Sequence, residues 1–209
     1  RGIFLADIDS DGDLDIVSAS HDDDTIAWYE NDGNSDPSFT KNVISTSADG
    51  ARGVHIADID SDGDLDIVSA SRIDNKIAWY ENDGAANPSW STTTIATSAA
   101  GARDIHIADM DNDGDLDIVS ASSGDDTIAW YENDGAANPS WTATDIATTA
   151  DGARDVYVSD LDNDGDLDIV SASTFDDTIA WYENDGAANP TWTATDIATT
   201  ADGARDVYV

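Results

Sequence analysis

One nine-residue stretch occurs four times in the sequence, and each copy places five aspartates at alternate positions around a single glycine. The second copy reads Asp-Ile-Asp-Ser-Asp-Gly-Asp-Leu-Asp. The copies begin at Asp7, Asp58, Asp109 and Asp160, so the period is 51 residues, and the intervening sequence repeats in step. A fixed period of this length is typical of chains built from stacked copies of one supersecondary unit. The sequence therefore predicts a tandem array.

Carboxylates spaced this closely repel one another, and a hard cation removes that repulsion. Ca²⁺ accepts about six to eight oxygen ligands at about 2.3–2.6 Å. Side chains at positions 1, 3, 5 and 9 of the stretch, with the backbone carbonyl at position 7, would surround one ion. The glycine at position 6, Gly63 in the second copy, permits the sharp turn because a residue without Cβ adopts positive φ freely. We therefore predict a metal-binding loop in every repeat.

Oxygen ligands alone, with no Cys or His in the stretch, favour Ca²⁺ over zinc or copper. Mg²⁺ fits less well because it usually retains several waters. We expect about one Ca²⁺ per repeat, four in total, as the cofactor. The candidate metal ligands are Asp7, Asp9, Asp11, Asp13, Asp15, Asp58, Asp60, Asp62, Asp64, Asp66, Asp109, Asp111, Asp113, Asp115, Asp117, Asp160, Asp162, Asp164, Asp166 and Asp168.

The stretch is not an EF-hand, because an EF-hand loop ends in a bidentate Glu at position 12. Position 12 is a serine in every copy here: Ser18, Ser69, Ser120 and Ser171. The alternative to a metal site is a solvated acidic turn. One copy would fit that alternative, but four copies with every aspartate and the glycine intact favour calcium.

The charge balance restricts the partners. The chain carries a formal net charge of −37 from 45 acidic and 8 basic residues, so we expect it to repel nucleic acids and anionic membranes. No apolar run approaches the roughly 18 residues of a membrane span, so we expect no membrane insertion. Sites made of aspartates alone would fill at extracellular calcium concentrations, which favours an extracellular or cell-surface location.

Each repeat contains four short runs of β-forming residues, which in the second repeat are residues 52–57, 65–71, 76–81 and 90–97. Turn signals separate the runs, the strongest being Asn82-Asp83-Gly84. Four-stranded units of this length in tandem are typical of β-propeller blades. We therefore predict an all-β fold, a β-propeller of four-stranded blades. Residues 1–209 would form one propeller segment with repeats 1–51, 52–102, 103–153 and 154–204 and the start of a fifth at 205–209.

The calcium loop, followed by Leu-Asp-Ile-Val-Ser-Ala-Ser and Ile-Ala-Trp-Tyr-Glu-Asn-Asp-Gly, resembles the FG-GAP/VCBS-type calcium-binding repeats of integrin α-subunit propellers and of many secreted bacterial proteins. The Phe-Gly and Gly-Ala-Pro signatures are not intact, so the bacterial VCBS-like branch is the closer match. The resemblance implies a complete propeller of about seven blades, with calcium between the first two strands of each blade. Further blades or a second chain would complete the ring; a closed four-bladed ring is the alternative.

These features predict a calcium-stabilised binding or adhesion scaffold within a secreted or cell-surface protein, whose ligand is a protein or a glycan. Two alternatives remain: a lectin-like, carbohydrate-binding propeller, and a non-catalytic propeller attached to a secreted enzyme. We assign no catalytic residue and do not expect an enzyme, because the acidic residues recur identically in every repeat whereas a catalytic pair is normally unique.

Three further slots recur once per repeat. Tryptophans on the third run, and aromatic residues beside the fourth, fit either packing between units or sugar stacking, and packing is favoured. His55 and His106 share a slot with Phe4 and Tyr157, which indicates packing rather than catalysis. Arginines at the start of each repeat are expected to pair with an acid, one candidate being the single Glu of the repeat. The members are Trp28, Trp79, Trp130 and Trp181; Phe39, Trp90, Trp141 and Trp192; Arg1, Arg52, Arg103, Arg154 and Arg205.

Overall fold

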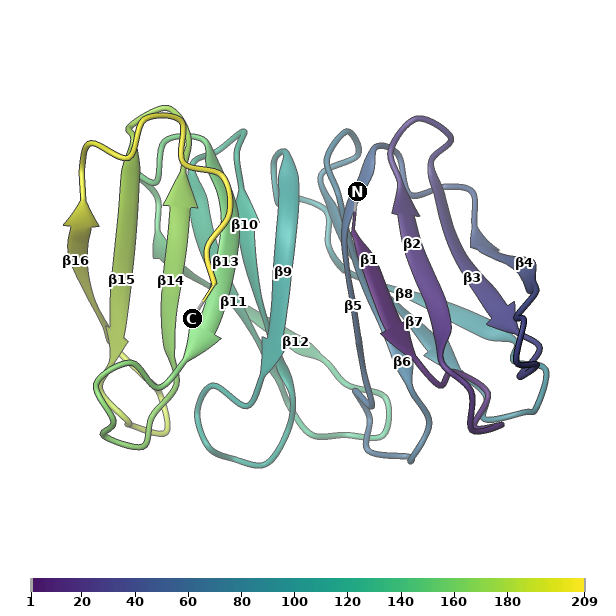
Figure 1. Ribbon diagram of the computed structural model, residues 1–209. Helices are drawn as coiled ribbons and strands as arrows, with labels where there is room; N and C mark the ends of the chain where they lie inside the picture. The colour runs from purple at the N-terminus through teal and green to yellow at the C-terminus, as the bar shows by residue number, and fades with distance from the viewer. Residues whose placement is uncertain (1, 209) are drawn as a thin grey trace.

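The computed structural model describes residues 2–208, which form sixteen strands in four antiparallel sheets, one sheet per repeat (Figure 1). The strands of the first sheet are β1 (Ile3–Ala6), β2 (Asp15–Ser20), β3 (Thr25–Asn31) and β4 (Phe39–Ser45); those of the second are β5 (Ala51–Ala57), β6 (Asp66–Ser71), β7 (Lys76–Asn82) and β8 (Trp90–Ala96). The third sheet contains β9 (Ala102–Ala108), β10 (Asp117–Ser122), β11 (Thr127–Asn133) and β12 (Trp141–Ala147); the fourth, β13 (Ala153–Ser159), β14 (Asp168–Ser173), β15 (Thr178–Asn184) and β16 (Trp192–Ala198). Arg1 and Val209 lie outside the described residues.

Each sheet is a meander in which sequence neighbours pair antiparallel, as Ile67 opposite Tyr80 on β6 and β7 illustrates. This topology places the aspartate loop and the connection between the third and fourth strands at one end of every sheet. The hairpin between the second and third strands lies at the other end (Figure 1). Residues 2–208 contain no helix that could span a membrane.

The apolar core lies between neighbouring sheets. One cluster joins Val17, Ile26 and Trp28 of the first sheet to Val54 and Ile67 of the second. Equivalent clusters join the second sheet to the third and the third to the fourth. One isolated sheet would leave these side chains exposed, so each repeat depends on its neighbours for stability.

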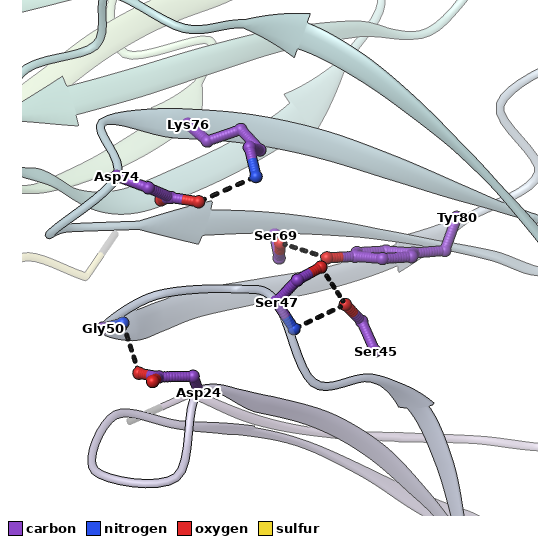
Figure 2. Close-up of polar contacts among 8 residues, drawn as sticks. All are labelled: Asp24, Ser45, Ser47, Gly50, Ser69, Asp74, Lys76 and Tyr80. Carbon is purple, nitrogen blue, oxygen red and sulfur yellow. Dashed lines mark hydrogen bonds and ion pairs between the residues drawn. The ribbon is translucent and has the colours of Figure 1, made fainter.

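Short polar contacts fix the connection from one repeat to the next. Asp24, in left-handed conformation with φ 55°, accepts a hydrogen bond through Oδ1 from the Gly50 N–H at 2.9 Å (Figure 2). Asn75, Asp126 and Asp177 make the same bond to Gly101, Gly152 and Gly203. Within the hairpin between β6 and β7, Lys76 Nζ also forms an ion pair with Asp74 Oδ2 at 2.8 Å (Figure 2).

The first strands of the four sheets lie next to one another, and an aromatic column crosses them. The ring centroids are 4.6 Å apart for Phe4 and His55, 5.3 Å for His55 and His106, and 4.9 Å for His106 and Tyr157. The predicted packing role of the two histidines is confirmed.

The all-β class and the four-stranded units are confirmed, but the predicted propeller is wrong. Each sheet is an open meander from its first to its fourth strand, and the four stand in tandem without closing or curling. Within residues 2–208, the three apolar clusters join consecutive sheets only. The expected ring of about seven blades, which depended on the propeller prediction, is therefore also not supported. The repeat pattern specifies a unit and its contact with the next unit, whereas closure depends on the rotation between units, which the pattern does not encode. The treatment of residues 1–209 as one segment stays a prediction.

Candidate metal centre in the aspartate loops

The aspartate at position 1 organises each loop by accepting two backbone hydrogen bonds. In the second loop, the Asp62 N–H donates to Asp58 Oδ1 and the Gly63 N–H donates to Asp58 Oδ2, both at 3.0 Å. Asp62 Oδ1 then accepts from the Asp64 N–H at 2.9 Å. The other three loops repeat the two position-1 bonds, at 3.0–3.2 Å. The chain therefore wraps around its own carboxylates.

Two positions in each loop have positive φ. Gly63 has φ 100°, as predicted, and its equivalents in the other loops have φ 100–102°. The residue at position 4 is also left-handed, although it is never glycine: φ is 59° at Ser10 and Ser61, 60° at Asn112 and 65° at Asn163. Sequence reasoning missed this second turn. The asparagines were the available signal, because Asn tolerates the left-handed region better than most residues.

One cluster of carboxylate oxygens forms in each loop. In the first and third loops, oxygens from positions 1, 3 and 9 lie within 4.8 Å of one another; in the second and fourth, positions 1, 3 and 5 do so. The members are Asp7, Asp9 and Asp15; Asp58, Asp60 and Asp62; Asp109, Asp111 and Asp117; Asp160, Asp162 and Asp164. This spacing is compatible with coordination of one calcium ion per repeat.

The position-3 aspartates test whether a cation fits. Oδ1 of Asp9, Asp60 and Asp111 is buried and has no hydrogen-bond partner. A buried carboxylate oxygen without a donor is costly unless a cation satisfies it. In the fourth loop, Asp162 Oδ1 accepts from the Asp164 N–H at 3.1 Å. Three loops thus present an unsatisfied oxygen beside two further carboxylates, and the donor set fits a hard divalent cation.

The electrostatics of the loop agree with this fit. Burial, followed by the charge of Asp62, raises the pKa of Asp60. Burial and Asp113 raise the pKa of Asp111 in the same way, and burial and Asp11 raise that of Asp9. In these three loops, burial and neighbouring carboxylates therefore make ionisation of the position-3 aspartate less favourable. A bound divalent cation would offset this cost.

Position 9 anchors the loop to the sheet. Asp66 is fully buried, its Oδ2 accepting from the Ile59 N–H at 3.2 Å and its Oδ1 from the Asn82 N–H at 2.8 Å. Burial raises the pKa of Asp66 and of Asp117 to about 7.

Position 7 contributes no side chain to a cluster. The Asp64 carboxylate instead lies so close to Gly84 that a Cβ on residue 84 would collide with it. That position 7 binds through its carbonyl stays a prediction, as does metal binding by the twenty aspartates.

Sequence reasoning missed an asparagine at the end of the third strand that joins consecutive loops. Asn133 is buried, and its Nδ2 donates to Leu116 O of its own loop at 3.1 Å and to Ile59 O of the preceding loop at 3.2 Å. Asn82 makes the same two bonds to Leu65 and Ile8, and Asn184 to Leu167 and Met110. A buried amide recurring once per repeat was the available signal, because such a group requires partners.

The other recurrent slots have structural surroundings. Trp28, Trp79 and Trp130 are 1–4% exposed within the clusters between sheets, which confirms packing for that slot. Trp90, Trp141 and Trp192 are half-buried against the same clusters.

The arginine slot differs from its prediction. The recorded ion pairs join His21 to Asp22 and Lys76 to Asp74, and none within residues 2–208 joins Arg103 or Arg154 to a glutamate. Glu81 instead accepts a hydrogen bond from Ser91 Oγ at 2.7 Å. The expected pairing with an acid, for which this glutamate was one candidate, is therefore not found for these two arginines within residues 2–208.

Sixteen strands in four consecutive sheets, with one acidic cluster per sheet, define an all-β tandem-repeat protein with candidate metal loops. The FG-GAP-like repeat model matches residues 7–69, 58–120 and 109–171, which cover most of the chain. The chain therefore belongs to the FG-GAP-like repeat family, as its resemblance indicated.

No curated protein matches the chain. Among solved structures, the chain is similar to the V. cholerae biofilm matrix protein Bap1, with 17% sequence identity and a TM-score of 0.48. The match covers 98% of this chain and 40% of the Bap1 chain, so the chain spans less than half the length of that structure.

Proposed function

We propose that this repeat protein is a calcium-stabilised, non-catalytic scaffold for binding or adhesion, belonging to a secreted or cell-surface protein. The observation that carries the proposal is the carboxylate cluster of each repeat, with oxygens of three aspartates within 4.8 Å of one another. In the second repeat, Asp58, Asp60, Asp62 and Asp66 would hold the ion, together with the carbonyl of Asp64. Bound calcium would supply charge compensation.

The chain's own groups explain why such compensation would stabilise the fold. Asp58 draws two backbone N–H groups into the loop, and Asp66 ties the loop to β7 through the Asn82 N–H. An ion bound at Kd gives stabilisation of RT ln(1 + [L]/Kd), about 2.7 kcal/mol per site at a hundredfold excess over Kd. Several such sites together would be comparable to the marginal stability of an ordinary domain.

The location and the ligand follow from charge and calcium supply. Weak all-oxygen sites fill at the calcium concentrations found outside cells. A net charge of −37 disfavours nucleic acid as the partner. We propose a protein or a glycan as the ligand of the scaffold. The lectin-like alternative has less support, because the tryptophans that would stack on sugars are half-buried between sheets.

Calcium titration by calorimetry tests the proposal. We expect about four sites per chain, and the variant Asp60→Asn should lose one of them because it removes a charge from the second cluster. The matched control is Asp36→Asn, which removes the same charge from an exposed loop and should retain all sites. Absence of calcium binding, or equal losses in the two variants, would contradict the proposal.

A further inference from the structure

A second polar site lies at the beginning of the first strands, at the end opposite the aspartate loops. A cavity of about 280 Å³ is lined by Arg52, Arg103 and Arg154, with Asp104, Asp155 and Asp206 beside them. Each of these arginines is the second residue of β5, β9 or β13, and these strands lie side by side (Figure 1). The repeat period therefore places three guanidinium groups around one cavity.

The grouping is unusual for a chain of this composition. The protein has 45 acidic and only 8 basic residues, so an arginine could readily find a carboxylate partner. Yet neither Arg103 nor Arg154 forms an ion pair within residues 2–208. Burial, and then the charges of Arg52, Arg72 and Arg154, lower the pKa of Arg103 to about 10. Arg103 is thus close enough to three other arginines for their charges to disfavour its own.

Three aspartates line the same cavity, and two of them are held by backbone N–H groups of the next repeat. Asp104 Oδ2 accepts from the Val156 N–H at 3.5 Å, and Asp155 Oδ2 accepts from the Val207 N–H at 2.7 Å, so both carboxylates face the next repeat. Burial and the adjacent Asp155 also raise the pKa of Asp104 well above its usual range. Neither carboxylate forms an ion pair with Arg103 or Arg154 within residues 2–208.

The slot after each arginine supports the same conclusion. It holds Gly2 and Gly53 in the first two repeats, and Asp104, Asp155 and Asp206 in the later ones. The arginine is therefore present whether or not an acid follows it. Pairing with the acid that follows it in the sequence therefore does not explain why an arginine recurs at this position.

We propose that this cavity binds a small oxyanion, of the sulfate or carboxylate class, between the guanidinium groups of Arg52, Arg103 and Arg154. Guanidinium forks bind planar or tetrahedral oxyanions through paired charge-assisted hydrogen bonds. The bound anion would relieve the repulsion among the arginines. This site is separate from the aspartate loops and is independent of calcium.

The test is titration of the whole chain with sodium sulfate in calorimetry, at ionic strength held constant with sodium chloride and with calcium present. Wild type should bind sulfate saturably. Arg103→Gln should weaken binding about tenfold or more, because it removes a charge-assisted fork. Lys41→Gln is the matched control: it removes the same charge from an exposed position on β4 and should bind as wild type does.

Two results would overturn the proposal. One is non-saturable heat in wild type equal to that of chloride at the same ionic strength. The other is an equal loss in Arg103→Gln and Lys41→Gln, which would indicate general charge attraction. Circular dichroism verifies that Arg103→Gln is folded; if it is not, Arg154→Gln replaces it with the same expectation. Because calcium binding is measured separately, failure here leaves the calcium proposal intact.

Discussion

At the residue scale, two half-buried histidines, His55 and His106, make stability depend on pH. Burial lowers the pKa of His55 to about 4, with a smaller contribution from His106, and burial lowers the pKa of His106. In the unfolded chain both would titrate near 6.5. Between about 6.5 and 4 the unfolded state therefore binds more protons than the folded state, so the free energy of unfolding falls as the pH falls.

Replacing both histidines by the residue that already occupies this slot at Phe4 should remove that dependence. We expect the double variant His55→Phe/His106→Phe to lose less stability than wild type between pH 7 and pH 4.5. Urea midpoints at the two pH values, at constant calcium, measure the difference. His21→Gln, in the hairpin before β3, serves as the control and should behave as wild type; parallel curves for all three proteins would disprove the account.

Asp104 makes the free energy of unfolding depend on pH in the opposite direction from the histidines. Its folded-state pKa is raised by burial and by Asp155, so ionisation becomes unfavourable in the folded protein as the pH rises above about 4. Asp104→Asn mimics the protonated acid and should raise the free energy of unfolding at pH 7 by about 1 kcal/mol, with no gain at pH 3. Chemical denaturation at both pH values decides it, and Asp36→Asn, at an exposed position, should change neither.

At the element scale, the loops behave as linked units because one asparagine side chain contacts two of them. Asn133 Nδ2 bonds to carbonyls of the second and third loops, at Ile59 and Leu116. Asn31, in the same slot of the first repeat, donates to Leu14 O of its own loop at 3.0 Å. The chain therefore contains both a linking and a non-linking version of the same residue.

This difference predicts unequal effects of the same substitution. Asn133→Ala should weaken calcium binding at two loops and destabilise the fold by about 1–3 kcal/mol, because two buried carbonyls lose a donor. Asn31→Ala should affect one loop and cost less. Calcium isotherms and urea midpoints of the two variants measure this, and identical losses would show that the inter-loop bond has no energetic consequence.

The strands were predictable at this scale because the turn residues delimit them. The runs predicted at residues 52–57, 65–71, 76–81 and 90–97 differ from β5–β8 by one residue at an end. The positive φ of Gly63 was predictable from its lack of Cβ. Contacts such as Asn133 to Ile59 were not, since they require the relative placement of two sheets, and local sequence does not contain it.

At the scale of the whole molecule, the inner and outer sheets differ in burial. Ile3 and Leu5 are 70% and 58% exposed on β1, whereas Val54 and Ile56 in the same slots of β5 are each 7% exposed. The last sheet shows the same trend: Trp181 on β15 is half-buried, whereas Trp28, in the same slot of the first sheet, is 1% exposed. Within residues 2–208, the first and last sheets each pack against one neighbouring sheet, whereas the two inner sheets pack against two.

This asymmetry predicts the order of local opening. In tandem arrays stability is the sum of unit and junction contributions, so end units open first. We expect backbone amides of β6, β7, β10 and β11 to exchange hydrogen more slowly than those of β2, β3, β14 and β15. Hydrogen-exchange mass spectrometry measures this directly, and uniform protection across the four sheets would contradict it.

The propeller expected from the repeat pattern was the largest error at this scale. Near-identical repeats, such as residues 103–153 and 154–204, define a unit and its junction. The number of units and the angle between them determine closure, and neither is a property of any one repeat. The same limitation applies to the arginine cavity, which exists only because first strands from successive repeats lie together.

The most direct test of the calcium account is a thermal melt by circular dichroism in EDTA, in millimolar CaCl₂ and in millimolar MgCl₂, at constant ionic strength. The account predicts a large rise in Tm with CaCl₂, because the ion offsets repulsion within each of the four aspartate clusters. Magnesium should give a much smaller rise. No change with calcium, or equal changes with both cations, would mean that the clusters are acidic turns responding to screening, and the calcium sites would be refuted.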